Sequence, residues 1–147
     1  MSETAPGVKP PQRVIAVWKG EQEFDTGKVG GPMDRIDGHG VSGPGPVDML
    51  LSALGACSAI DVVSILKKQR TPPTALEVEV VGTRDDATPR RLRHALLKFR
   101  ISGPGIEREQ ALKAIALSVT KYCSVRDSLD PAIPVEWELE LKQGVSD

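Results

Sequence analysis

Residues 47–70 have the sequence VDMLLSALGACSAIDVVSILKKQR, which contains no proline and is followed by Thr71, Pro72 and Pro73. Because the residue before a proline disfavours helical geometry, this proline pair predicts where a long helix stops. Basic residues gather in its last turn, where positive charge suits the helix dipole. Apolar residues surround most of its circumference, which predicts a helix at the centre of the molecule or at an interface.

Five other segments have the composition or the alternation of apolar and polar residues that predicts β-strands. They are Arg13–Gly20, Glu21–Gly30, Ala75–Arg84, Arg93–Ser102 and Val135–Lys142. A second, amphipathic helix is expected over Ile106–Tyr122. The resulting order, β-β-α-β-β-α-β, predicts an α+β domain with antiparallel sheet.

Two segments outside these predicted elements are rich in proline or glycine. Residues 1–12 hold three prolines and no apolar periodicity, so we expect a flexible N-terminal arm, followed by one domain over residues 13–147. Residues 30–46 contain six glycines and three prolines. This composition predicts a long loop, and long ordered loops in compact domains tend to line functional sites.

The charge and the hydrophobicity of the chain argue against nucleic acid and membranes as its main partners. The net charge is −1 and no basic stripe is present, which argues against nucleic acid as the main partner. The N-terminal residues lack the basic-then-apolar order of a secretion signal. Ser52, Gly55, Ser58 and Asp61 interrupt the most apolar stretch, so no membrane span is expected there. A cytoplasmic location is the expectation.

The chain has two cysteines, Cys57 and Cys123, far apart in sequence. This number favours free thiols or a redox pair over a disulfide framework. Cys57 lies within the long helix, where a buried structural cysteine is one interpretation. A reactive thiolate is the other, and it requires positive charge or hydrogen bonds that lower its pKa. His39 and His94 lack the close spacing to these thiols that a zinc site would need.

A family resemblance favours the reactive thiolate. SGPGPVDMLLSALGACSAIDVVSILKKQR (residues 42–70), followed by TKYCSVRDSL (residues 120–129), resembles the OsmC/Ohr family of osmotically inducible and organic hydroperoxide resistance proteins. The resemblance implies an OsmC-like fold, with antiparallel β-sheets wrapped around two central helices in an intertwined homodimer. It also places the active sites at the subunit interface.

The resemblance further implies a thiol-dependent peroxidase that reduces organic hydroperoxides in defence against oxidative or osmotic stress. Cys57 matches the peroxidatic position, whose thiolate would become a sulfenic acid. Cys123 matches the resolving position and would condense with that acid to form a disulfide. An external thiol or dithiol would restore both sulfurs, with no metal or organic cofactor. The alternative is a non-catalytic dimeric protein on the same fold, associated with stress or binding a small ligand.

Two further residues are expected to activate Cys57. In the family, a glutamate about ten residues before the first cysteine acts together with an arginine. Here Asp48 lies nine residues before Cys57, half a turn away on an ideal helix, and its other role is to complement the helix dipole. Arg35 in the glycine-rich loop is the expected arginine, with Arg13 of the partner subunit as the alternative. Ser124 is expected only to pack or to end a helix.

Overall fold

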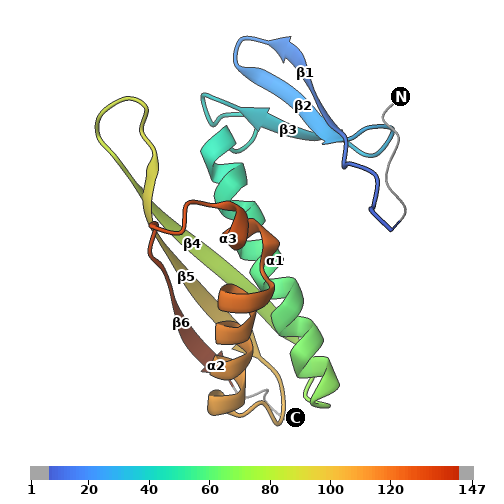
Figure 1. Cartoon of the computed structure of the whole chain (residues 1–147), viewed down its shortest axis with the longest axis vertical. Coiled ribbons are helices and arrows are strands. Elements are labelled where there is room, and N and C mark those ends of the chain that lie inside the picture. Colours follow the sequence, from blue (N-terminus) through green and yellow to red (C-terminus); the bar gives the residue numbers. More distant parts are fainter. Residues whose placement is uncertain (1–6, 143–147) are drawn as a thin grey trace. The chain divides into compact units, whose positions relative to one another are not determined.

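A computed structural model of the chain describes residues 7–142 (Figure 1). Residues 1–6 of the predicted arm and residues 143–147 lie outside this range. The described elements follow one another as β1 (Val14–Gly20), β2 (Glu23–Lys28), β3 (Asp34–Asp37), α1 (Pro46–Lys68), β4 (Ala75–Arg84), β5 (Leu92–Ser102), α2 (Arg108–Leu117), η1 (Ser118–Tyr122), α3 (Ser124–Ser128) and β6 (Val135–Lys142). The chain divides into two compact units between Met49 and Leu50.

The N-terminal unit is a three-stranded antiparallel sheet in the order β1-β2-β3. Trp18 pairs with Phe24, and Phe24 pairs with Ile36, so these three apolar side chains share one face. Trp18 is 65% exposed and Phe24 is 37% exposed. The sheet therefore leaves an apolar face unburied within the single chain.

The predicted loop over residues 30–46 is only partly a loop, because it contains β3. The sequence analysis missed this strand because glycine and proline flank it on both sides. The strand forms through its pairing with β2, which depends on tertiary context. After β3 the chain turns around the Asp37 carboxylate, which accepts hydrogen bonds from the backbone N–H groups of His39, Val41 and Ser42. The backbone donors of Ser42 and His39 outweigh burial and lower the pKa of Asp37 to about 2.

The C-terminal unit is a three-stranded sheet in the order β4-β5-β6, and α1 and α2 both pack on one of its faces (Figure 1). Its core joins Leu66 of α1, Phe99 of β5, Ile115 of α2 and Leu139 of β6. The alternation along β5 explains this arrangement, because every second residue from Ala95 to Ile101 is buried. The predicted α+β class is confirmed by this architecture.

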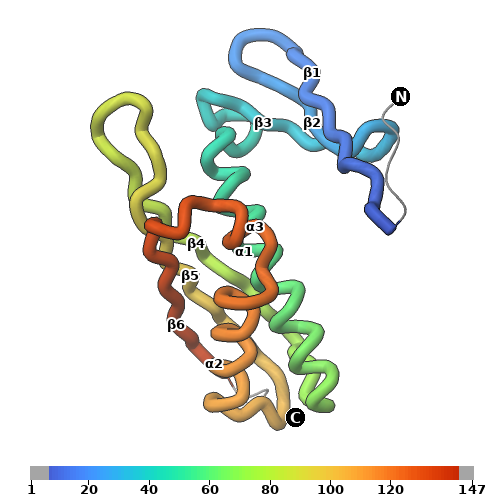
Figure 2. The backbone as a smooth tube through the Cα atoms, in the orientation of Figure 1, coloured from blue at the N-terminus to red at the C-terminus, as the bar shows by residue number. Residues whose placement is uncertain are grey.

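One pairing differs from the expected antiparallel sheet: β5 and β6 run parallel. Figure 2 follows the backbone from β5 through α2, η1 and α3 before it returns as β6. A helical crossover of this kind is what parallel neighbours require. The second predicted helix also differs, because it is α-helical only to Leu117 and then continues as the π-helix η1.

Helix α1 approaches the sheet closely at Gly55. A Cβ atom placed on Gly55 would lie 2.8 Å from Cγ2 of Val80, which is closer than real contacts allow. Within the single chain α1 buries one face rather than most of its circumference, and Ile60 on another side is 65% exposed. In length and hydropathy α1 qualifies as a membrane span, contrary to the sequence-based expectation. Its buried face, however, belongs to the core of the unit.

Candidate active site

The fold of the C-terminal unit brings the two thiols together. Cys57 is half-buried in the middle of α1, whereas Cys123 follows η1, is 2% exposed and is the N-cap residue of α3. Both are free thiols, and the residue after each one contacts the other: Ser124 Oγ lies 3.8 Å from Cys57 Sγ, and Ser58 Oγ lies 3.5 Å from Cys123 Sγ. A peroxidatic and a resolving sulfur need this proximity, because a disulfide requires the two Cα atoms within roughly 7 Å.

Local geometry makes Cys57 the more acidic thiol. Burial raises the pKa of Cys57, but hydrogen bonds to its sulfur outweigh burial and lower that pKa below the ordinary value. The donors are the backbone N–H of Val125, the thiol of Cys123, and the hydroxyl and backbone N–H of Ser124. None of these groups carries a formal charge, so the thiolate is stabilised by fixed dipoles on the segment that follows the second cysteine.

Cys123 has the opposite tendency. Burial, the largest cause, raises its pKa; the Ser58 hydroxyl and the Arg126 backbone N–H lower it in part, and the neighbouring Cys57 raises it by smaller amounts. Ser58 Oγ lies 3.5 Å from Cys123 Sγ, and the Arg126 nitrogen lies 3.4 Å from the same sulfur. Of the two thiols, Cys57 is therefore the one that ionises more readily.

The π-helix η1 fixes Cys123 against α1. The backbone N–H of Cys123 donates to the carbonyl of Ser118, five residues earlier, at 2.8 Å. The buried Ser118 hydroxyl in turn donates to the backbone carbonyl of Ser58 at 2.6 Å. One turn of widened helix thus places the second sulfur beside the first, and π-bulges of this kind are frequent at functional sites.

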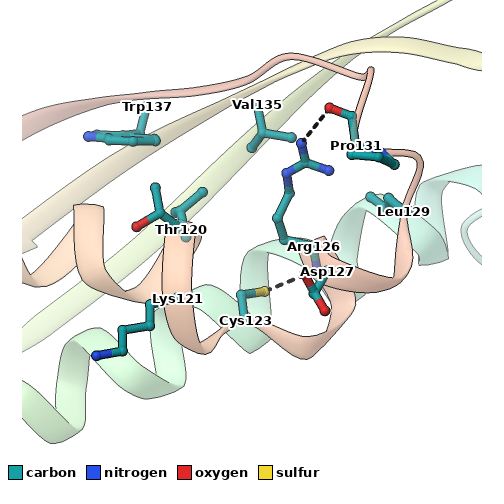
Figure 3. Close-up of a pocket in the computed structure, with 10 residues that line it drawn as sticks. Thr120, Lys121, Cys123, Arg126, Asp127, Leu129, Pro131, Val135 and Trp137 are labelled. Atoms are coloured by element: carbon teal, nitrogen blue, oxygen red, sulfur yellow. Dashed lines mark hydrogen bonds between the residues drawn. The ribbon is translucent and has the colours of Figure 1, made fainter.

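A cavity of about 320 Å³ lies next to Cys123, and Figure 3 shows residues that line it. Trp137 and Val135 from β6, with Thr120 from η1, form part of its wall. The Arg126 guanidinium points away from Cys123 toward Pro131 in the loop before β6 (Figure 3). It donates to the carbonyls of Ile133 at 2.9 Å and Pro131 at 3.5 Å. Arg126 therefore acts on Cys123 through its backbone N–H rather than through its charge.

The other two predicted site residues belong to the N-terminal unit. Arg35 donates to Asp25 at 2.7 Å and lies 3.3 Å from Glu23, so its charge is paired within the sheet. Asp48 accepts a hydrogen bond from the backbone N–H of Gly45 at 2.9 Å. This bond joins the third residue of the helix to the residue before it, as in a capping box. The activating roles of Arg35 and Asp48 stay predictions.

Sequence reasoning missed the serines of this site. Ser58 and Ser118 are completely buried, and Ser124 contacts Cys57, with 3.8 Å between Oγ and Sγ. One signal was available, because a serine directly follows each cysteine. Within residues 7–142, no cluster of three or more His, Cys, Asp or Glu residues could hold a metal ion.

Comparisons with known proteins agree with this fold. The family model described as OsmC-like protein matches residues 38–138. Protein YhfA of Escherichia coli K12 is 38% identical over 107 residues, which cover 72% of this chain and 80% of YhfA.

Two solved structures have the same fold at lower identity. An OsmC-like protein from Mycoplasma pneumoniae is 20% identical, with a TM-score of 0.77 over 91% of this chain and 99% of its own. The organic hydroperoxide resistance protein OhrB of Bacillus subtilis is 17% identical, with a TM-score of 0.58 over 90% of this chain and 98% of its own. Because the family model spans both cysteines and most of the fold, the chain belongs to the OsmC-like family.

Proposed function

We propose that the protein is a cysteine-based peroxidase that reduces organic hydroperoxides in the cytoplasm. The observation that carries the proposal is a pair of neighbouring free thiols, in which Cys57 contacts Ser124, the residue after Cys123, and has a lowered pKa, whereas Cys123 has a raised one. This difference in pKa suits a mechanism in which Cys57 is the nucleophile of the first step and Cys123 reacts only in the second. The structural likeness to an organic hydroperoxide resistance protein supports the substrate class by analogy.

In the first step the Cys57 thiolate attacks one oxygen of the peroxide bond. An S–O bond forms and the O–O bond breaks, so the sulfur is oxidised to a sulfenic acid. The leaving alkoxide takes up a proton and departs as an alcohol. Cys57 is half-buried rather than fully enclosed, so part of the residue stays accessible to solvent.

In the second step the Cys123 sulfur attacks the Cys57 sulfur. A disulfide forms, and hydroxide leaves and is protonated to water. An external thiol or dithiol then supplies two electrons by thiol–disulfide exchange and restores both thiols. No metal or organic cofactor takes part in this cycle. The proposal keeps Arg35 and Asp48 as further activators of Cys57.

The proposal includes a homodimer with active sites at the subunit interface. Each unit carries an apolar surface that the single chain leaves exposed, at Trp18 and Phe24 on the N-terminal sheet and at Ile60 on α1. Exposed apolar surface of this kind marks interaction sites. A second copy of the chain is the partner that the family implies.

The test is a titration of free thiols in the reduced protein with tert-butyl hydroperoxide. We expect both thiols to disappear with one equivalent of peroxide, and mass spectrometry of peptides to find a Cys57–Cys123 disulfide within one chain. Hydrogen peroxide in a parallel titration measures the preference for an alkyl substrate. If Cys57 stays reduced under excess alkyl hydroperoxide, the protein is instead a dimeric binding protein with inactive thiols.

A further inference from the structure

We propose that Ser58 and Ser124 form a crossed pair of hydroxyl donors, each supporting the cysteine that it does not follow in sequence. Ser124 follows Cys123 but contacts Cys57, whereas Ser58 follows Cys57 but contacts Cys123. In this scheme, Ser124 stabilises the thiolate of the first step and Ser58 that of the second. The inference rests on the proposed peroxidase function, although its test requires no peroxide.

Ser124 is placed to donate to Cys57. The distance between its Oγ and Cys57 Sγ is 3.8 Å, which is long for neutral partners and leaves room to shorten when the sulfur ionises. The residue is exposed, and across residues 7–142 its hydroxyl has no other hydrogen-bond partner. Its proton is therefore free to point at the sulfur whenever Cys57 becomes a thiolate.

Ser58 is a donor with two acceptors. Its buried hydroxyl lies 2.9 Å from the backbone carbonyl of Leu54 and 3.5 Å from Cys123 Sγ. A hydroxyl has a single proton, so it donates to one acceptor at a time. While Cys123 is a neutral thiol, the shorter bond to Leu54 is favoured. An anionic sulfur is the stronger acceptor, so ionisation of Cys123 turns the hydroxyl toward it.

The order of the two steps follows from the coupling between the thiols. The negative charge of Cys57 contributes to the raised pKa of Cys123. Conversion of Cys57 to a neutral sulfenic acid removes that charge, which makes Cys123 easier to ionise at the moment when its attack is required. Ser58 then supplies the hydrogen bond for this second thiolate, at a cysteine that is only 2% exposed.

The test is a titration of each thiolate by its ultraviolet absorbance, in variants that retain one cysteine. Cys123→Ser leaves Cys57 as the only thiol, and Cys57→Ser leaves Cys123. Adding Ser124→Ala should raise the pKa of Cys57 by about one unit, which leaves about tenfold less thiolate at neutral pH. Adding Ser58→Ala should raise the pKa of Cys123 by a similar amount. Crossed combinations, with each serine tested against the other thiol, should show no shift.

Matched controls separate hydrogen bonding from general loosening of the site. Ser128→Ala removes a hydroxyl of α3 that donates to the Ser124 carbonyl and should leave both titrations unchanged. Ser124→Thr keeps the hydroxyl and should restore the Cys57 pKa. Ser58→Ala places a strong helix former inside α1, so the fold should be retained.

Unchanged titrations in Ser124→Ala and Ser58→Ala would overturn the inference, as would equal shifts in the Ser128→Ala control. Since no peroxide is involved, this outcome leaves the proposed peroxidase activity standing. Conversely, if the protein consumes no peroxide but the variants show the crossed pKa shifts, the inference about the serine pair is supported and the proposed peroxidase function is overturned.

Discussion

Replacement of Cys57 by serine should reduce the consumption of alkyl hydroperoxide to the rate seen in buffer alone. A serine hydroxyl is not ionised near neutral pH, so the hydrogen bonds that lower the Cys57 pKa would have no thiolate to stabilise. The loss should be complete rather than partial, because Cys123 is buried and has a raised pKa. Peroxide consumption is measured with excess dithiol, so that regeneration of the enzyme does not limit the rate.

The matched control is Cys123→Ser, which retains the nucleophile and removes the resolving sulfur. In the absence of external thiol this variant should consume one equivalent of peroxide per chain and stop. Cys57 would then remain as a sulfenic acid, which a dione reagent converts to an adduct detectable by mass spectrometry. Wild-type activity in Cys57→Ser would remove Cys57 from the mechanism.

Phe99→Ala should lower the free energy of unfolding by about 3–5 kcal/mol, which for a small domain is a large part of its stability. Phe99 is 1% exposed and is the largest fully buried side chain of the described core, in the central strand β5 beneath both helices. Its removal leaves a cavity that the surrounding aliphatic residues fill only in part. Urea denaturation followed by circular dichroism measures the change.

The neighbouring Lys98 provides the control for this substitution. Its side chain alternates to the opposite face of β5, so Lys98→Ala should change the free energy of unfolding by less than about 0.5 kcal/mol. A loss below about 1 kcal/mol in Phe99→Ala would mean that the core lies elsewhere or repacks without a cavity.

Much of this fold could be predicted from the sequence, because its signals are local. Alternation identified β4, β5 and β6, and the proline pair after the helix marked where α1 ends. The errors concern features that depend on distant partners. The strand β3 exists through its pairing with β2, and the parallel direction of β6 follows from the helical crossover.

The candidate site also has features that the sequence predicts and features that it does not. The two cysteines were recognisable from sequence together with a family resemblance, and the family is shown by the comparisons. The contacts of Arg35 and Asp48 were not predictable, because an ion pair with Asp25 and a hydrogen bond to Gly45 depend on how each local segment folds. The π-helix was also missed, since its residues have the composition of an ordinary helix.

The sequence by itself determined most of the strands and both long helices, where α1 ends, and which two side chains are thiols. Only the tertiary structure decided that these sulfurs, 66 positions apart in the sequence, lie in one site and that their pKa values move in opposite directions. The reason is that a thiol's acidity depends on the groups around it in space. Here those groups are backbone and hydroxyl dipoles from a segment that is separated from α1 along the chain by two strands and another helix.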